Sequence, residues 1–412
     1  MAKIKAFKAI RPTRDKVHLV ATRPFYTYKK NVLKAKLEDN PYTFLHIINP
    51  EFGLAKKTKP NSTERFQHVL NKYADFRKKN ILTKDDHEHV YIYSQTKNGQ
   101  SCFGVIAGAS IEEYLNGQIK IHESTLSARE VIFTRYLEVV GFNAEPVLLT
   151  YQGNDEIEKS LKAKMSQRPE FEFTTTDKIT HELWILNSDQ TASLQSLFES
   201  IKTLYIADGH HRSASSVRYW NQKNDNKEEI RTNEEFFLSF MVDERLVQIF
   251  AFHRLVKDLN GLTKNQFFDA LASLGKLEKL SSFEKPTQKH QFVICLSDEM
   301  YRLTLSGDLI PKNNPAKAID AELLTNHILN PILGIEDLRL SQKIDFIPDI
   351  EDTDRILERV SGGKMAVAFI LFPCSIEDIR EVADLNLFMP PKSTWVEPKL
   401  RSGLTIYPLS DD

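Results

Sequence analysis

The sequence predicts a mixed α/β protein with two domains. Short runs rich in β-branched and aromatic residues alternate with stretches whose apolar residues recur every three or four positions. No internal repeat, low-complexity tract or long Gly/Ser linker interrupts this alternation. At 412 residues the chain exceeds the size at which one hydrophobic core usually stops growing, so two domains, or one large domain with insertions, are expected.

The predicted strands are short apolar runs. In chain order they are "FLHIINP" from Phe44, "HVYIYSQT" from His89, "SCFGVIAGASI" from Ser101, "PVLLTYQ" from Pro146, "HELWILN" from His181, "TLYIAD" from Thr203, "FFLSFMVD" from Phe236, "QFVICLSD" from Gln291, "MYRLTLS" from Met300 and "MAVAFILFP" from Met365. The Asn-Gly pair between the second and third runs is typical of a hairpin turn.

The predicted helices carry apolar residues at helical spacing. They are "STERFQHVLNKYADFRKK" from Ser62, "TLSAREVIFTRYLEVV" from Thr125, "SDQTASLQSLFESI" from Ser188, "NQFFDALASLG" from Asn265 and "SIEDIREVADL" from Ser375. In the first of these, Glu64 complements the helix dipole, whereas Arg65 excludes a capping box. The stretch "FHRLVKDLNGLTKNQ" passes from a strand through Asn-Gly into a new helix, which places a domain boundary near Leu255 to Thr263.

Composition excludes several classes of protein. Lys plus Arg number 55 and Asp plus Glu number 56, so the chain has no bulk attraction for nucleic acid or anionic lipid. The three cysteines are isolated, which favours a reduced, cytoplasmic compartment and no zinc site. The N-terminus lacks the apolar core of a signal peptide, and "MAVAFILFP" is too short to span a bilayer, so we expect no membrane partner.

The stretch "YIADGHHRSASS" is the strongest candidate site. We predict a strand that ends at Asp208, a sharp turn at Gly209 and a helix whose first N–H groups favour an anion. Arg212 would make a bidentate contact with phosphate or carboxylate, while His210 or His211 would donate hydrogen bonds or move a proton. The alternative is structural: Asp208 caps the helix, and the histidines and Arg212 solvate its first turn.

The stretch "KIHESTLSARE" is a second candidate. Glu123 beside His122 would serve as a general base for a hydroxyl if the two lie within hydrogen-bond reach of it. The alternative is that Ser124 or Thr125 caps the following helix and that Glu123 complements its dipole.

The stretch "MPPKSTWVEPKLRSG", residues 389–403, is a third candidate. Three prolines stiffen it while it displays Lys392, Lys399 and Arg401, so it would fold back onto a phosphate site. The alternative is a rigid surface closure with solvated charges. The sequence contains no glycine-rich dinucleotide fingerprint, P-loop, nucleophile elbow or zincin helix, which argues against kinases and NTPases of the common designs.

Six stretches together resemble a bacterial family known as domain of unknown function 1015. They are "NPYTFLHIINPE", "IKIHESTLSAR", "EPVLLTYQG", "YIADGHHRSASS", "FHRLV" and "MPPKSTWVEPKLRSG". The resemblance covers nearly the whole chain, and the motifs stand in the order of the family.

The Asp-Gly-His-His-Arg turn also resembles the second motif of the ParB and sulfiredoxin superfamily, where it follows a strand and contacts phosphate. The stretch "TLSAREVIFTRYLEVVGFNAEPVLLTY" looks like the helix, turn and strand upstream of that motif. The resemblance implies a ParB/sulfiredoxin-like core in residues 1–255 with an insertion at about 152–200. A second α/β domain, 256–412, would follow, and its tail 389–403 would return to the site.

Three activities of the superfamily compete. Sulfiredoxin carries a cysteine in its turn, and His210 stands in that place here, which disfavours reduction of a sulfinic acid. ParB proteins bind CTP and DNA with a helix-turn-helix module and a basic surface, and we find neither in this sequence. The ADP-dependent free-serine kinases use a glutamate upstream of the turn to activate serine, and Glu123 stands at a similar position.

The resemblance to these kinases implies ADP or ATP as the cofactor and a small hydroxy amino acid such as free serine as the substrate. Glu123 would take the proton of the acceptor hydroxyl with the help of His122, and Asp208 would either bind Mg²⁺ or orient His211. Arg212 would neutralise charge on the transferred phosphoryl group. The groups implied to hold the nucleotide or the acceptor are Gly209, His210, Arg212, Ser213, Lys392 and Lys399.

Two other functions stay open at this stage. One is a nucleotide-binding regulator without turnover, which would read ADP, ATP or CTP with the same turn. The other is a DNA- or partner-binding protein in the manner of ParB, which the near-neutral charge disfavours. The sequence leaves the oligomeric state open.

Overall fold

The structure is a computed structural model that describes residues 1–350 and 353–410, and it divides into two compact units. Unit 1 comprises Met1–Lys120, Thr125–Val247 and the segment that begins at Pro398, whereas unit 2 comprises Ile121–Ser124 and Gln248–Glu397. The predicted domain boundary between residues 255 and 256 therefore lies eight residues after the boundary in the structure, between Val247 and Gln248. The strand around it pairs on both sides within the sheet of unit 2, and residues from Pro398 onward do not belong to the second unit.

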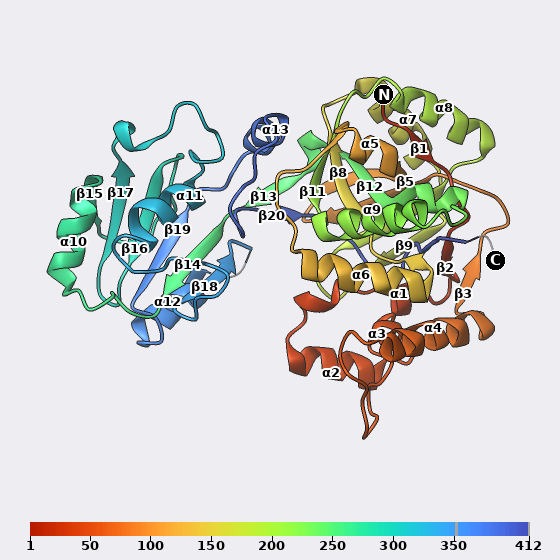
Figure 1. Ribbon diagram of the computed structural model, residues 1–412, viewed down its shortest axis with the longest axis horizontal. Coiled ribbons are helices and arrows are strands. Elements are labelled where there is room, and N and C mark those ends of the chain that lie inside the picture. The colour runs from red at the N-terminus through yellow and green to blue at the C-terminus, as the bar shows by residue number, and fades with distance from the viewer. Residues whose placement is uncertain (351–352, 411–412) are drawn as a thin grey trace. The chain divides into compact units, whose positions relative to one another are not determined.

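Unit 1 is built on a nine-stranded mixed sheet (Figure 1). Its strands run in the order β6-β11-β8-β12-β5-β4-β10-β9, with β1 paired to β5. β6 pairs with β11 and β8 with β12 in parallel, and the other pairs are antiparallel, which confirms the α/β class. The strands are β1 (Ile4–Lys5), β4 (Tyr91–Lys97), β5 (Gln100–Ser110), β6 (Ile119–Lys120), β8 (Val147–Tyr151), β9 (Phe171–Thr174), β10 (Thr180–Ile185), β11 (Leu204–Asp208) and β12 (Phe236–Asp243).

Helices cover this sheet and extend beyond it. They are α1 (Val17–Val20), α2 (Lys30–Asp39), α3 (Leu45–Ile48), α4 (Thr63–Lys78), α5 (Ile111–Leu115), α6 (Ser127–Val140), α7 (Asp155–Met165), α8 (Ser188–Phe198) and α9 (His210–Asp225). α6 packs beside α9, and α4 packs on α6 (Figure 1). Two small ribbons complete the unit: β2 (Ile10–Pro12) with β3 (Leu82–Lys84), and β7 (Phe142–Asn143) with β21 (Tyr407–Pro408).

Local signals explain several elements. β4 and β5 form the predicted hairpin, and Asn98 and Gly99 both have the positive φ that such a turn needs, 52° and 78°. The predicted helix from Ser62 is α4, in which the Ser62 side chain accepts from the N–H of Arg65. The predicted strand "FLHIINP" is wrong, because Leu45–Ile48 forms the helical turn α3. A short apolar run does not distinguish a buried strand from a buried helical turn.

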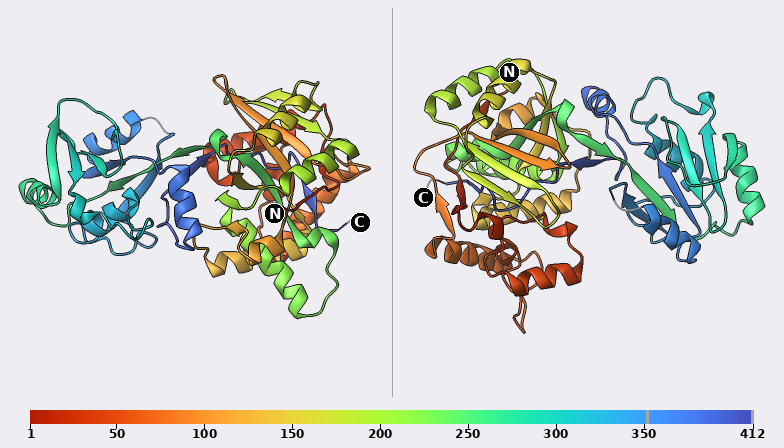
Figure 2. Two further views of the ribbon diagram at one scale, coloured as in Figure 1. Left: turned by 90° about the horizontal axis from the view of Figure 1, so that it is seen from above. Right: turned by 180° about the vertical axis from the view of Figure 1, so that it is seen from behind.

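Unit 2 is built on an antiparallel six-stranded sheet (Figure 2). A hydrophobic core lies on each face of this sheet. In order its strands are β15 (Gly275–Leu280), β17 (Met300–Leu305), β16 (Gln291–Cys295), β19 (Val367–Leu371), β14 (Phe252–Val256) and β18 (Ile344–Pro348), while β13 (Gln248–Phe250) pairs separately with β20 (Trp395–Glu397). Phe292 and Ile294 join the core that contains α10 (Lys264–Ala272), α11 (Asp320–Leu324) and α13 (Ile376–Asp384). Val293 and Cys295 join the core that contains α12 (Thr353–Ser361), as the two-residue period of a strand requires.

The last described stretch, residues 398–410, which we call the closing segment, is buried in unit 1. Its backbone pairs with Thr22 at Ser402 and with Ile10 at Ile406. Gly403 has a φ of 76°, and a Cβ there would lie 2.5 Å from the ring of Phe44, so the segment needs glycine at this position.

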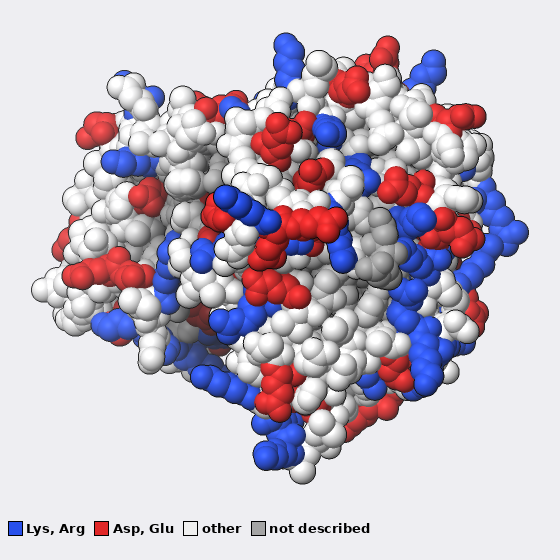
Figure 3. Space-filling model, turned by 45° about the vertical axis from the view of Figure 1, so that its right-hand side comes forward, with Lys and Arg blue, Asp and Glu red and all other residues white. Residues whose placement is uncertain are grey.

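The charged surface matches the near-zero net charge. On the face drawn in Figure 3, acidic and basic side chains are interspersed. Among the helices of residues 1–350 and 353–410, none combines the length and the apolar character needed to cross a membrane.

Candidate functional site

The predicted strand, turn and helix are β11, Gly209 and α9. Gly209 is the first residue before the helix, with φ 104° and ψ 25°, and no side chain caps the helix there. A Cβ on Gly209 would lie 2.6 Å from Nη2 of Arg212, so the guanidinium folds closely over the turn. The alternative in which Asp208 caps the helix is therefore wrong. The first turn of α9 directs its N–H groups out of the helix end.

The Asp208 carboxylate lies between two cations. Its Oδ1 is 2.6 Å from Nζ of Lys399, and its Oδ2 is 2.8 Å from Nη2 of Arg212. Burial alone would raise the pKa of Asp208, but the charges of Lys399 and Arg212 outweigh it and lower the pKa to about 2. Asp208 is therefore ionised at neutral pH and is a weak base.

A second carboxylate extends this arrangement. Nη1 of Arg212 is 3.2 Å from Oε2 of Glu145, whose Oε1 accepts a hydrogen bond of 2.7 Å from the Ser402 hydroxyl. Lys399, Asp208, Arg212 and Glu145 thus form a chain of alternating charge, which we call the charge network. Nε of Arg212 is buried and makes no hydrogen bond with any residue in the described ranges, so the guanidinium keeps an unused donor.

The other residues of the turn differ in what they offer a ligand. Ser213 is fully buried, its hydroxyl donates to the carbonyl of His210 at 3.0 Å, and its N–H donates to the carbonyl of Gly209 at 3.1 Å. Ser213 therefore keeps no donor for a nucleotide, contrary to the expectation from the sequence. The His210 side chain is buried, whereas that of His211 is half-buried.

The donor set around Asp208 does not fit a resident Mg²⁺. Both carboxylate oxygens already contact cationic side chains, which would repel a metal ion. Within residues 1–350 and 353–410, no group of three or more His, Cys, Asp or Glu side chains is arranged to hold a metal. We therefore derive no step through a protein-bound metal.

Lys392 belongs to unit 2 and Lys399 to unit 1. Lys392 has a φ of 62°, and its Nζ lies 5.0 Å from the ring centroid of Phe252. Its carbonyl accepts from Nη2 of Arg254 at 3.1 Å. Of the two lysines predicted to bind the ligand, the structure places Lys399 at the turn and Lys392 on an aromatic ring of unit 2.

His122 and Glu123 also belong to unit 2. His122 is buried, and its carbonyl accepts from the N–H of Met389 at 2.8 Å, while Glu123 is half-buried. The alternative in which Ser124 or Thr125 caps the helix is wrong, because the residue before α6 is Leu126, without a side-chain cap.

Strand register gives the chain direction at this point. Lys120, the last residue of β6, pairs in parallel with Tyr205 of β11. The carboxyl ends of β6 and β11 therefore lie at the same edge of the sheet. Glu123 is the third residue after Lys120, and Asp208 is the third after Tyr205.

The structure reveals a buried network around Arg401 that sequence reasoning missed. Arg401 Nη2 is 3.0 Å from both Asp177 oxygens, and Nε is 3.2 Å from Nε2 of His181, whose Nδ1 is 2.8 Å from the Tyr93 hydroxyl. Burial, followed by the charge of Arg401, lowers the pKa of His181 to about 3, so the imidazole is neutral. The sequence suggested a displayed cation, but Arg401 fixes the closing segment two residues from Lys399.

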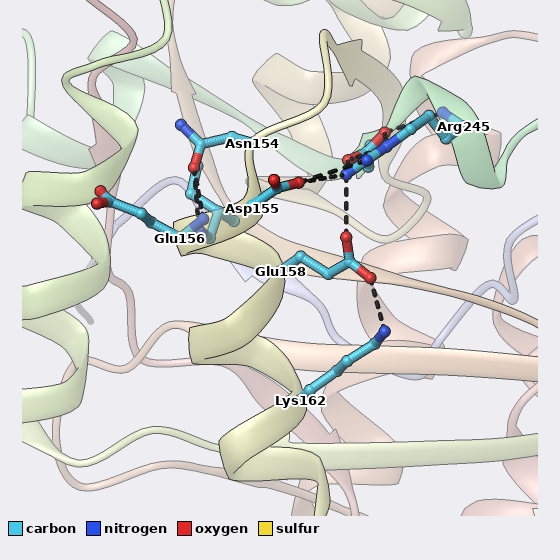
Figure 4. A network of polar contacts seen from close by, with 8 residues as sticks. Asn154, Asp155, Glu156, Glu158, Lys162 and Arg245 are labelled. Atoms are coloured by element: carbon cyan, nitrogen blue, oxygen red, sulfur yellow. Dashed lines mark hydrogen bonds and ion pairs between the residues drawn. The ribbon is translucent and has the colours of Figure 1, made fainter.

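A further polar cluster surrounds Arg245 (Figure 4). Its Nη2 lies 2.7 Å from Asp243 and 2.9 Å from Glu158, and Asp155 lies 3.4 Å from its Nη1. A cavity of about 240 Å³ opens beside it, at the end of β8 and β12 opposite to that of Asp208. Because three carboxylates already surround this guanidinium, we assign it a structural role.

The comparison with protein families decides the relationship. The family described as "Protein of unknown function (DUF1015)" matches residues 4–324. The chain belongs to the DUF1015 family. No curated protein matches this DUF1015 chain.

Several solved structures are similar to it at low identity. A free serine kinase in complex with AMP is 13% identical, with a TM-score of 0.36 over 73% of this chain and 91% of that chain. SbnI with a C-terminal truncation, from Staphylococcus aureus, is 12% identical, with a TM-score of 0.39 over 74% of this chain and 90% of that chain. A conserved hypothetical protein from Pyrococcus furiosus is 13% identical, with a TM-score of 0.36 over 75% and 96%. These TM-scores are low, and we draw nothing about function from them.

Proposed function

We propose that the turn at residues 208–212 binds the diphosphate of ADP or ATP and that this DUF1015 protein transfers a phosphoryl group to a small hydroxy amino acid such as free serine. The observation that carries the proposal is the convergence of Lys399 and Arg212 on Asp208 beside the N-terminus of α9. Lys399 is 191 positions from Asp208 in the sequence, so the fold brings this second cation to the turn.

The charge network suits reversible binding of phosphate. Its two cations, Lys399 and Arg212, are balanced by the two carboxylates of Asp208 and Glu145. A diphosphate would accept from Nε of Arg212 and from the first turn of α9, with the positive charge of Lys399 at the same turn. Asp208 would then be a positioning residue that holds both cations toward the ligand.

The base of the proposed reaction has to be another carboxylate, because the low pKa of Asp208 leaves it little affinity for a proton. We propose Glu123, with His122 positioning it. The choice follows the resemblance, and in the structure the chain passes from β6 of unit 1 into Ile121–Ser124 of unit 2.

With ADP as donor, the serine hydroxyl oxygen would attack the β-phosphorus, and the bond from that phosphorus to the bridging oxygen would break. The products would be phosphoserine and AMP, and the hydroxyl proton would pass to Glu123. Arg212 would stabilise the charge that develops on the transferred group.

The test is an assay of the purified full chain with ADP or ATP and serine, in which phosphoserine is measured by mass spectrometry and nucleotide affinity by calorimetry. Glu123→Gln should abolish turnover but leave nucleotide affinity unchanged, whereas Arg212→Ala should weaken nucleotide binding. Lys223→Met is the matched control, since Lys223 forms a comparably buried ion pair with Glu234 at 2.6 Å. Full activity in Arg212→Ala, or loss of nucleotide binding in Glu123→Gln, would refute the assigned roles.

One observation favours a second function, a nucleotide-binding regulator without turnover. Phosphoryl transfer usually needs a divalent cation, and the residues around Asp208 do not offer it a site. Nucleotide binding that depends on Arg212, without phosphoserine formation from any combination of ADP, ATP, serine and added Mg²⁺, would support this function over the first.

A further inference from the structure

Unit 2 contains a small pocket that the proposed function does not use. It has a volume of about 200 Å³ and lies beside the start of α11, the loop before β16 and the helix α13. Since a water molecule occupies roughly 30 Å³ in the liquid, the pocket has room for roughly six waters. A ligand there would have the size of a small amino acid, much smaller than a nucleotide.

The pocket is lined by a buried carboxylate that is only half satisfied. Asp320 is 6% exposed, and its Oδ1 accepts from the N–H of His290 at 2.9 Å. Its Oδ2 is buried and accepts no hydrogen bond from any of the residues that the structure describes. A buried oxygen of this kind is costly unless a donor reaches it.

The charge at this position strengthens the need for a donor. Burial raises the pKa of Asp320 to about 7, because it penalises the charged carboxylate more than the N–H of His290 and the charge of Lys289 favour it. Lys289, the lysine beside His290, is engaged with Asp378 at 2.6 Å. A cationic hydrogen-bond donor placed against Oδ2 would satisfy the orphaned oxygen and compensate the buried charge together.

The pocket also has a cation to pair with a negative group of the ligand. Lys312 lines the pocket and is exposed. The walls also include small and apolar groups such as Ala318 and Pro373, which limit the size of a ligand side chain.

We propose that this pocket binds a small α-amino acid, with the ammonium group against Oδ2 of Asp320 and the carboxylate toward Lys312. Unit 2 alone supplies every residue of the site. The assignment is independent of the proposed phosphotransfer and gives the protein a second ligand site.

The test is calorimetry on the full chain without nucleotide, with glycine as the main probe. Glycine has no hydroxyl group to phosphorylate, so its binding does not depend on the proposed phosphotransfer. Ethanolamine, which lacks the carboxylate, and lactate, which lacks the ammonium, should each bind about tenfold more weakly or not at all.

Variants locate the site. Asp320→Asn keeps the acceptor for His290 and removes the charge, and it should weaken glycine binding at least about tenfold. Lys312→Gln should weaken glycine but leave ethanolamine unchanged. Asp308→Asn, at an exposed carboxylate of the same unit outside the pocket, is the matched control. If Asp320→Asn fails to fold, Ala318→Leu blocks the pocket instead.

The outcomes separate the two proposals. Glycine binding that Asp320→Asn or Ala318→Leu abolishes supports the pocket, whether or not phosphoserine forms. Absence of glycine binding in the wild-type chain, or equal glycine affinity in wild type and the pocket variant, would overturn it.

Discussion

Replacing Lys399 with methionine would remove one of the two cations at Asp208 while keeping an unbranched side chain of similar length. The pKa of Asp208 is about 2, against an ordinary 3.8, a difference of nearly two units. At about 1.4 kcal/mol per unit, this carboxylate, with its cations outweighing its burial, stabilises the folded chain by roughly 2–3 kcal/mol. The charge of Lys399 lowers the pKa of Asp208 more than that of Arg212 does, so its loss should cost about 1–2 kcal/mol at pH 7.

The sign of the pH dependence follows from the lowered pKa. A carboxylate whose pKa is lower in the folded chain contributes its full stabilisation above about pH 5 and loses it as the pH falls through about 4 toward 2. The difference in unfolding free energy between wild type and Lys399→Met should therefore shrink by roughly a third at pH 3 and further toward pH 2.

Calorimetry measures this, since it resolves the transitions of a protein with two units. The transition of unit 1 should fall by about 3–6 °C in Lys399→Met at pH 7 and by clearly less at pH 3. Lys399→Arg, which keeps the charge, should recover most of the loss. An equal decrease at both pH values would refute the assignment of the effect to the Asp208 ion pair.

Two further substitutions probe the turn and the closing segment. Gly209→Ala should destabilise unit 1 by about 1–3 kcal/mol and weaken ADP binding. The reason is that residue 209 has a φ of 104° and that the added Cβ would meet the guanidinium of Arg212. Wild-type affinity for ADP in calorimetry would contradict this prediction. Arg401→Met should lower the free energy of unfolding by about 3–5 kcal/mol, since it leaves the Asp177 carboxylate without its cation beside the neutral His181. Denaturant unfolding measures this loss. A change below about 1 kcal/mol would argue against a stabilising network.

Signals from residues close together in the sequence were enough to predict much of the fold. The Asn-Gly turn between β4 and β5, the helix α4 that follows Ser62 and the strand-turn-helix around Gly209 all depend on residues close together in the sequence. The strand predicted at Phe44 failed because burial, and not periodicity, decides the conformation of a short apolar run.

The candidate site was predictable only in part, for a related reason. The turn is local, but the partners that define its electrostatics are distant. Glu145 and Ser402 are 257 positions apart, and Arg401 is 224 positions from Asp177. Both Glu145 and Ser402 stand in stretches that carry the family resemblance, which was the one available signal for them. The sequence predicted that Lys399 returns to the turn. That Asp208 pairs with two cations could be established only from the distances in the structure.

The closing segment has a consequence for how the protein is made. Unit 1 includes Met1–Lys120 and Thr125–Val247, yet its β7–β21 ribbon and its charge network are completed by residues that follow the whole of Gln248–Glu397. A ribosome must therefore synthesise unit 2 before Lys399 exists to meet Asp208. During that interval the nascent first unit would have its turn in place without its second cation, and contacts of such large sequence separation form slowly. Formation of the complete charge network is thus tied to synthesis of the closing segment.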